Sequence, residues 1–175
     1  MSNKNKIIKV YIDNCVFSKL LRNTINDKEQ LKALEKIYDC DYIDLFVSEE
    51  IFKEFVKTKE DNIRIALKLF YKLIKKIPNA NIIKFEGGLS FPFSFPINFG
   101  IAVKDKIFLR LKKIFKNGDE VHINNAIKAD CKYFLTLDYK TILNTIKKDR
   151  FLAEIKEICP DLEFVDPKTL LEKMI

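Results

Sequence analysis

Metal-binding cysteine pairs and long apolar runs are both absent from this chain of 175 residues. None of its four cysteines has the C-x-x-C spacing and His122 is its single histidine, so the sequence disfavours a structural zinc site. No stretch approaches the roughly 20 consecutive apolar residues of a membrane helix, and the N-terminal apolar run is too short for a signal peptide. We therefore expect a cytoplasmic protein with reduced thiols and no membrane association.

The balance of charge is positive, with 32 lysines and arginines against 25 aspartates and glutamates and a formal net charge of +7. This excess favours a polyanionic partner, most commonly nucleic acid, although a lysine-rich solvated surface explains the same count. The length suits one domain with one substantial core, so residues 1–175 are predicted to form a single domain.

Apolar patterning alternates between strand-like and helix-like stretches along the chain. Short apolar runs predict strands at 7–12, 42–47, 81–85, 133–137 and 162–165. Helical spacing of apolar residues predicts helices at 24–40, after Ser48, at 61–77, 101–116, 119–132, 139–146 and 151–158, and after Asp166. This alternation predicts an α/β fold with a mostly parallel central sheet.

The segment 86–100, EGGLSFPFSFPINFG, interrupts this alternation. Its glycines and prolines exclude a regular helix, and its four phenylalanines make it too apolar for a plain solvated loop. We interpret it as an irregular insertion and leave three roles open: a lid over a substrate, a dimer contact, or a loop packed on its own core.

Four acidic residues stand where predicted strands end or predicted helices begin. Asp13 follows the run IIKVYI, and Glu54 lies one turn into the helix that follows YIDLFV. Asp119 opens the helix of GDEVHINNAIKADCKYFLTLD, and Asp138 closes the apolar run of this stretch. Parallel topology puts strand ends and the following helix starts at one edge of a sheet, so the four carboxylates can meet there.

Converging carboxylates raise one another's pKa, so such a cluster needs a compensating charge. Mg²⁺ or Mn²⁺ supplies that charge, because both ions take hard oxygen ligands. Water bound to such an ion has a lowered pKa and can attack a phosphodiester. Taken one at a time, the acids have simpler explanations: Asp13 as a strand cap, and Glu49, Glu50 and Glu54 as acids that start a helix.

Four patches of sequence carry a family resemblance. They are VYIDNCVF around Asp13, VSEEIFKEF ending near Glu54, GDEVHINNAI with Asp119, and FLTLD ending at Asp138. Over nearly the whole chain they resemble the PIN-domain nucleases, especially the small bacterial and archaeal ones of the VapC toxin type. The resemblance implies a Rossmann-like three-layer α/β/α sandwich and an Mg²⁺- or Mn²⁺-dependent endoribonuclease that cuts RNA. It also implies a homodimer and, for a toxin of a toxin–antitoxin pair, an antitoxin protein as partner.

The resemblance assigns roles to the acids one by one. It implies catalytic acids at Asp13, Glu54, Asp119 and Asp138, with the three aspartates as metal ligands. Glu50, one turn before Glu54, competes for the role of second acid. Glu54 is the sixth residue after Ser48, which fits the spacing of the family.

Neighbouring residues are expected to support the acids. The resemblance implies that the hydroxyl of Thr136 supports the pocket, and Asn14 is placed either to orient Asp13 or to cap the chain locally. At Cys15 many relatives carry Asn or Ser. We interpret His122 as structural, because the metal chemistry needs no imidazole.

The predicted helix 101–116 combines an apolar stripe with a basic surface. Lys104, Arg110, Lys112 and Lys113 lie on this surface and are candidate contacts for RNA phosphates. A solvated basic face accounts for the same pattern, so both interpretations stay open.

Three functions compete for these motifs. The first is a metal-dependent ribonuclease that hydrolyses RNA with metal-activated water. The second is a non-catalytic PIN-like module that binds RNA or protein, and the intact set of four acids argues against it. The third, a phosphohydrolase of the haloacid dehalogenase kind, needs an aspartate two residues after Asp13, where Cys15 stands.

Overall fold

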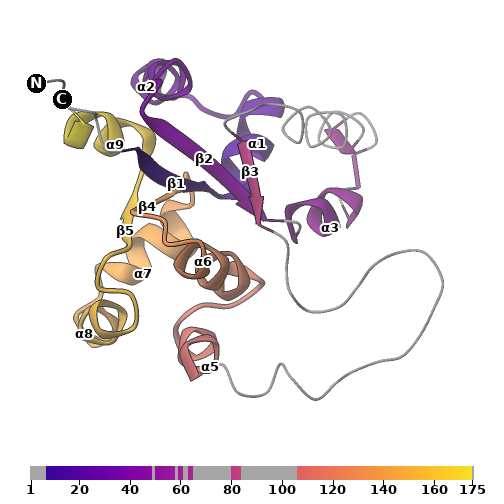
Figure 1. Cartoon of the computed structure of the whole chain (residues 1–175). Coiled ribbons are helices and arrows are strands. Elements are labelled where there is room, and N and C mark those ends of the chain that lie inside the picture. The colour runs from indigo at the N-terminus through magenta and orange to yellow at the C-terminus, as the bar shows by residue number, and fades with distance from the viewer. Residues whose placement is uncertain are drawn as a thin grey trace, which may run out of the picture.

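The computed structural model describes residues 7–48, 50–57, 59–60, 63–64, 80–83 and 106–174. In these residues five strands form one sheet in the order β3-β2-β1-β4-β5, and each neighbouring pair is parallel (Figure 1). The strands are β1 (Ile8–Ile12), β2 (Ile43–Ser48), β3 (Ala80–Ile83), β4 (Tyr133–Leu135) and β5 (Glu163–Val165). The predicted α/β class is confirmed, with a sheet that is parallel throughout its described part.

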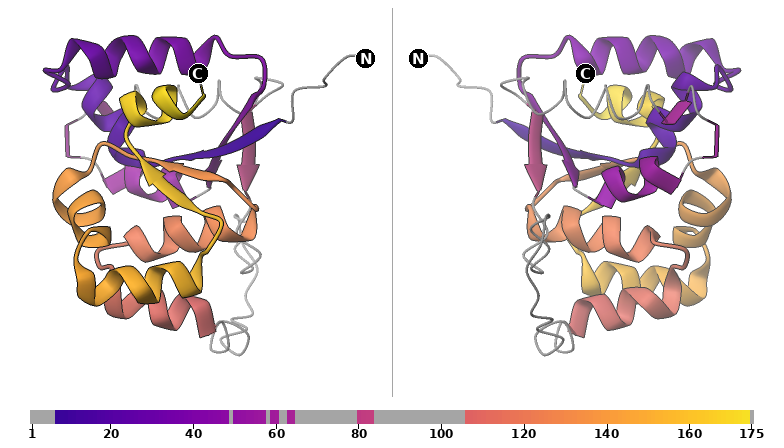
Figure 2. Two further views of the ribbon diagram at one scale, coloured as in Figure 1. Left: turned by 90° about the vertical axis from the view of Figure 1, so that its left-hand side faces the viewer. Right: turned by 90° about the vertical axis from the view of Figure 1, so that its right-hand side faces the viewer.

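Helices connect the strands and cover both faces of the sheet. They are α1 (Asn14–Leu21), α2 (Lys28–Tyr38), α3 (Glu50–Lys57), α5 (Lys106–Ile114), α6 (Asp119–Lys128), the π-helical turn η2 (Tyr139–Leu143), α7 (Asn144–Ile146), α8 (Asp149–Ile158) and α9 (Pro167–Met174). Figure 2 shows α2 and α9 on one side of the sheet and α5, α6 and α8 on the other. The arrangement agrees with a three-layer α/β/α sandwich.

Consecutive residues of β1 supply the two cores, because side chains alternate across a strand. Val10 packs with Val16 of α1 and the other apolar residues on the α2 and α9 side. Tyr11 packs on the opposite side, where its ring stacks on that of Phe134 with 5.2 Å between the ring centroids. Tyr11 is fully buried, so its hydroxyl requires a polar partner inside the protein.

The order of the strands reverses beside β1. The chain runs outward from β1 through β2 to β3, then returns to the opposite side of β1 to form β4 and β5. Val10 is therefore paired with Leu45 of β2 on one side and with Tyr133 of β4 on the other. Open α/β sheets bind their ligands in the crevice at such a reversal, outside the carboxyl ends of the strands.

Helix α1 is absent from the sequence-based predictions. It begins directly after Asp13, whose side chain makes no capping hydrogen bond to it. Burial of Val16 and Phe17 against the sheet stabilises this helix, although Asn, Cys, Val and Ser have modest helix propensity. The predicted cap at the last helix is confirmed, because the Thr169 backbone N–H donates to Asp166 Oδ1 at 2.8 Å.

Several predicted elements differ in their bounds or lie elsewhere in the chain. Strand β4 ends two residues earlier than expected, and the predicted helix 139–146 contains the π-helical turn η2. The insertion 86–100, Lys104 and most of the predicted helix 61–77 lie outside the described residues. Within the described ranges, no helix has the length and apolar character needed to cross a membrane.

Candidate functional site

A pocket of about 490 Å³ opens at the carboxyl edge of the sheet. Its lining residues are Asp13, Asn14, Cys15, Ser18, Glu54, Lys57, Asn117, Asp119, His122 and Asp138, which together we call the acidic pocket. The four acids proposed from the sequence all belong to it, although they come from four distant stretches of chain. Glu54 rather than Glu50 is the acid of α3 that lines the pocket.

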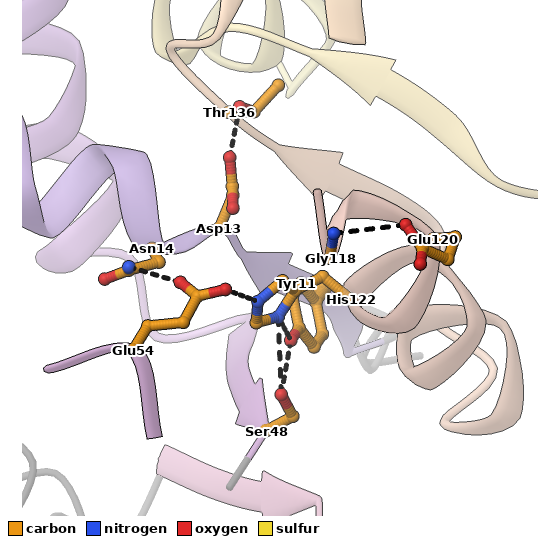
Figure 3. Close-up of polar contacts among 9 residues, drawn as sticks. All are labelled: Tyr11, Asp13, Asn14, Ser48, Glu54, Gly118, Glu120, His122 and Thr136. Atoms are coloured by element: carbon orange, nitrogen blue, oxygen red, sulfur yellow. Dashed lines mark hydrogen bonds and ion pairs between the residues drawn. The ribbon is translucent and has the colours of Figure 1, made fainter. Parts of the chain in front are cut away.

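Asp13 is fixed where β1 and β4 end side by side. Its backbone N–H donates to the carbonyl oxygen of Leu135 at 3.0 Å, which extends the pairing of the two strands by one step. The Thr136 hydroxyl then donates to Asp13 Oδ2 at 2.6 Å (Figure 3). Thr136, expected to support the pocket, therefore contacts one of its acids, and both side chains are buried.

Asp119 and Asp138 approach each other through one hydroxyl group. Thr141 Oγ1 lies 3.0 Å from Asp119 Oδ2 and 2.6 Å from Asp138 Oδ2. The hydroxyl has a single hydrogen, so it can donate to only one carboxylate at a time. Asp138 also accepts a hydrogen bond from the Thr141 backbone N–H at 2.7 Å, which fixes it at the start of η2.

The charge of Asp119 is poorly compensated. Burial and the negative charges of Asp13 and Asp138 raise the pKa of Asp119 to about 6, although the bond from Thr141 and the charge of His122 act in the opposite direction. Burial is the largest cause of this shift and the two neighbouring carboxylates add to it, so this part of the pocket disfavours a further negative charge.

Gly118 sets the position of Asp119. Its φ of +100° lies in the left-handed region, which a residue with a side chain rarely adopts. Asn117 precedes it with φ of 63°, so two left-handed residues turn the chain sharply before α6 begins. A Cβ atom at Gly118 would lie 3.5 Å from Glu54 Oε1, so this turn also brings the backbone close to the fourth acid.

Glu54 is held by hydrogen bonds to both of its carboxylate oxygens. Oε1 lies 2.9 Å from His122 Nε2, and Oε2 accepts from Asn14 Nδ2 (Figure 3). Asn14 therefore orients Glu54 rather than Asp13. Burial alone would raise the pKa of Glu54, but the hydrogen bond and charge of His122 and the bond from Asn14 outweigh burial and lower it.

Cys15 takes part in the same hydrogen-bonding network. Its Sγ lies 3.0 Å from Thr136 Oγ1 and accepts from the Leu137 backbone N–H at 3.1 Å. Burial, followed by the charge of Asp13, raises the pKa of Cys15 well above its usual value, so the thiol stays protonated. A sulfur atom thus makes hydrogen-bonding contacts to Thr136 and Leu137 at this position.

The pocket has the kind of ligand atoms that bind a divalent cation, but these atoms are not as close together as in a site that contains the ion. Across residues 7–48, 50–57 and the other described ranges, no three His, Cys, Asp or Glu side chains are grouped closely enough to hold a metal ion as they stand. Hard carboxylate oxygens are the ligands that Mg²⁺ and Mn²⁺ prefer, and the charges of Asp13 and Asp138 add to burial in raising the pKa of Asp119. We conclude that the residues fit such an ion in their chemistry.

The basic helix contributes fewer free cations than its sequence suggests. Arg110 binds Glu157 with two hydrogen bonds of 2.9 Å and Glu154 with one of 3.2 Å. Lys112 and Lys113 are exposed, so they remain the candidates on α5 for RNA contact.

Two lining residues of the pocket, and one residue in contact with its acids, were missed or given another role by sequence reasoning. Thr141 bridges two acids, and its spacing from Asp138 is that of a helix-capping pair, which is a usable signal. Lys57 adds a positive charge to the pocket lining. His122 lines the same pocket and binds Glu54, which its isolated position in the sequence gave no reason to expect.

Comparison with models of known protein families found no match to this chain, and comparison with curated proteins found none either.

Proposed function

We propose that this chain is a PIN-like, Mg²⁺- or Mn²⁺-dependent endoribonuclease that hydrolyses phosphodiester bonds of RNA in the cytoplasm. One observation carries the proposal: four acids from four distant segments line one pocket at the strand-order reversal of a parallel sheet. Hydrolysis of a phosphodiester anion requires a positive charge beside the phosphate, which a divalent cation can supply. The pocket is rich in the carboxylate oxygens that bind such a cation.

The proposed metal ligands are Asp13, Asp119 and Asp138. A divalent cation bound by them would neutralise charge on the phosphodiester and lower the pKa of an attacking water. The Thr136 hydroxyl donates to Asp13, and the Thr141 hydroxyl can donate to either of the other two carboxylates, so both threonines help to orient the oxygens before any ligand arrives.

Lys57 and Glu54, which also line the pocket, are proposed to act on the RNA substrate. Lys57 lines the pocket and offers a positive charge to an entering phosphate group. Glu54 contributes a fourth carboxylate that is oriented by Asn14 and His122. Its proposed part in catalysis therefore depends on these two partners.

Cleavage of single-stranded RNA in Mn²⁺, Mg²⁺ and EDTA tests the proposal. We expect metal-dependent cleavage by the wild type, none by Asp119→Asn, and wild-type cleavage by Asp130→Asn. Asp130 suits this control because its side chain is 92% exposed and lies outside the acidic pocket. Equal cleavage by wild type and Asp119→Asn would place the activity at another site or in a contaminant.

A non-catalytic PIN-like module that binds RNA or protein is the alternative outcome. It would show RNA binding without cleavage and no rise in melting temperature with metal. The family resemblance also leads us to propose a second copy of the chain and an antitoxin protein as partners. Sedimentation of the purified protein tests the former, and co-purification with the product of a neighbouring gene tests the latter.

A further inference from the structure

The single histidine of the chain is buried beside the acidic pocket, where its ring contacts residues of α3 and β1. His122 lies on α6, one turn after Asp119, and its side chain is 3% exposed. Its Nε2 lies 2.9 Å from Glu54 Oε1 on α3, and its Nδ1 lies 2.7 Å from the Tyr11 hydroxyl on β1 (Figure 3). Ser48, at the end of β2, lies 3.4 Å from the same Nδ1.

The hydrogens of this network indicate the charge of the imidazole. The Tyr11 hydroxyl has one hydrogen and donates it to Ser48 Oγ at 2.7 Å, so Nδ1 of His122 must carry its own hydrogen to bond Tyr11. An ionised Glu54 can only accept, so Nε2 must carry a hydrogen as well. Both ring nitrogens are then protonated, which makes the ring an imidazolium.

A neutral ring requires the opposite directions of donation. Ser48 would donate to Tyr11, and Tyr11 would donate to Nδ1 of His122. The charges around the ring favour the imidazolium. Glu54 is in contact with the ring, and Asp13 and Asp119 lie nearby. Burial alone would lower the pKa of His122, but the hydrogen bond and charge of Glu54, with the charges of these aspartates, outweigh it and raise the pKa.

We infer that His122 is a buried imidazolium and a positioning residue: its ion pair with Glu54 fixes that carboxylate and leaves the three aspartates to bind the cation. The inference rests on the proposed function for its effect on cleavage, whereas the charge of the ring is measurable without substrate. His122 and Lys57 together offset two of the four carboxylate charges of the pocket lining. One divalent cation then balances the remaining two.

Nitrogen NMR of the histidine ring tests the ion pair directly. Because His122 is the only histidine, a protein labelled with ¹⁵N-histidine and carrying no tag gives a single set of ring signals. At pH 7.5 without metal we expect both nitrogens in the protonated range, and a neutral ring in Glu54→Gln. The matched control Glu50→Gln changes an acid of the same helix outside the pocket, so it should keep the imidazolium. A neutral ring in the wild type, or a ring unaffected by Glu54→Gln, overturns the inference.

Metal affinity separates this positioning role from a merely structural one. His122→Gln removes one positive charge, so Mn²⁺ should bind roughly three- to tenfold more tightly, while KM for RNA rises. The double change Glu54→Gln with His122→Gln removes one charge of each sign and should restore wild-type Mn²⁺ affinity. Unchanged or weaker Mn²⁺ binding in His122→Gln contradicts the inference. If the wild type cleaves no RNA, the proposed function fails while the NMR and Mn²⁺ results still decide the role of His122.

Discussion

The acidic pocket has two sides that differ in how their negative charge is balanced. On the paired side, Glu54 is held by His122 and Asn14, and its pKa is lowered by them despite its burial. On the aspartate side, burial and the nearby charges of Asp13 and Asp138 raise the pKa of Asp119 to about 6. On the paired side, groups of the protein itself balance the charge of Glu54. On the aspartate side, the carboxylates still repel one another, and a bound cation would relieve this repulsion.

This difference predicts that substitution of an acid on the aspartate side reduces RNA cleavage most. Asp119→Asn removes one of the proposed metal ligands, so we expect metal-dependent cleavage to fall by on the order of a thousandfold or more. RNA cleavage assayed across Mn²⁺ concentrations measures the loss. Asp130→Asn is the matched control, because Asn tolerates the left-handed backbone of this residue, whose φ is 55°. Loss of activity in the control would indicate a general effect of the substitution.

The threonine hydroxyls of the aspartate side should have the next largest effect. Thr136→Val removes the 2.6 Å hydrogen bond to Asp13 and keeps the shape of the side chain. Supporting residues of metal sites typically change affinity or activity by about 10- to 100-fold, and we expect a loss of this order in Mn²⁺ binding and kcat. The exposed Thr24, which lies outside the acidic pocket, provides the control Thr24→Val. Equal behaviour of the two variants would show that this hydroxyl does not position Asp13.

The turn between the two sides should be sensitive to a side chain at one residue only. Gly118→Ala forces φ of +100° on a residue with a Cβ atom and should reduce the free energy of unfolding by about 1–2 kcal/mol. Asn117→Gly, at φ of 63°, should change it by less than about 0.5 kcal/mol, because Asn and Gly both accept this conformation. Urea denaturation of both variants measures the contrast, and equal losses would contradict the account of the turn.

The pH dependence of stability should reveal the raised pKa of Asp119. The folded-state pKa of Asp119 is about 6 against an ordinary value of 3.8, so the folded protein binds this proton more tightly than the unfolded chain. The stability that protonation contributes is present below pH 4 and is lost as the pH rises to about 6. In metal-free buffer, Asp119→Asn should match the wild type at pH 4 and exceed it by about 1 kcal/mol at pH 7, after allowance for solvent screening. Thermal unfolding of both proteins across this range gives the difference, and parallel curves would contradict it.

Surface lysines outside both sides should have the smallest effect. Lys112→Ala and Lys113→Ala should each weaken RNA binding by roughly two- to threefold at low salt and have little effect at high salt. Binding titrations at two salt concentrations measure this dependence. An effect independent of salt would argue against a phosphate contact.

Local patterns in the sequence predicted most of the scaffold. The β-branched run before Asp13 forms β1, and the helix opened by Asp119 forms α6, because both have the periodicity of their element. Parallel topology was enough to bring the four acids to one edge. Helix α1 was missed because its stability comes from the burial of Val16 and Phe17 rather than from a helical pattern of its own.

The paired side could not be read from the sequence. His122 is separated from Glu54 by 68 residues and from Tyr11 by 111, so no local spacing links them. The spacing from Ser48 favoured Glu54 over Glu50, but nothing in that spacing indicated the contact of Glu54 with His122. These contacts depend on which strand lies beside which, and a single sequence does not specify side-chain positions at that level.

Titration of Mn²⁺ into three proteins without RNA tests whether the aspartate side of the pocket holds the cation. The three proteins are the wild type, Asp119→Asn and Glu54→Gln. We expect the wild type to bind Mn²⁺, Asp119→Asn to lose binding, and Glu54→Gln to keep it, because the ring of His122 loses its charge together with Glu54. Equal loss in both variants would mean that Glu54 is a ligand like the aspartates. Binding retained in both would mean that the aspartate side does not hold the cation.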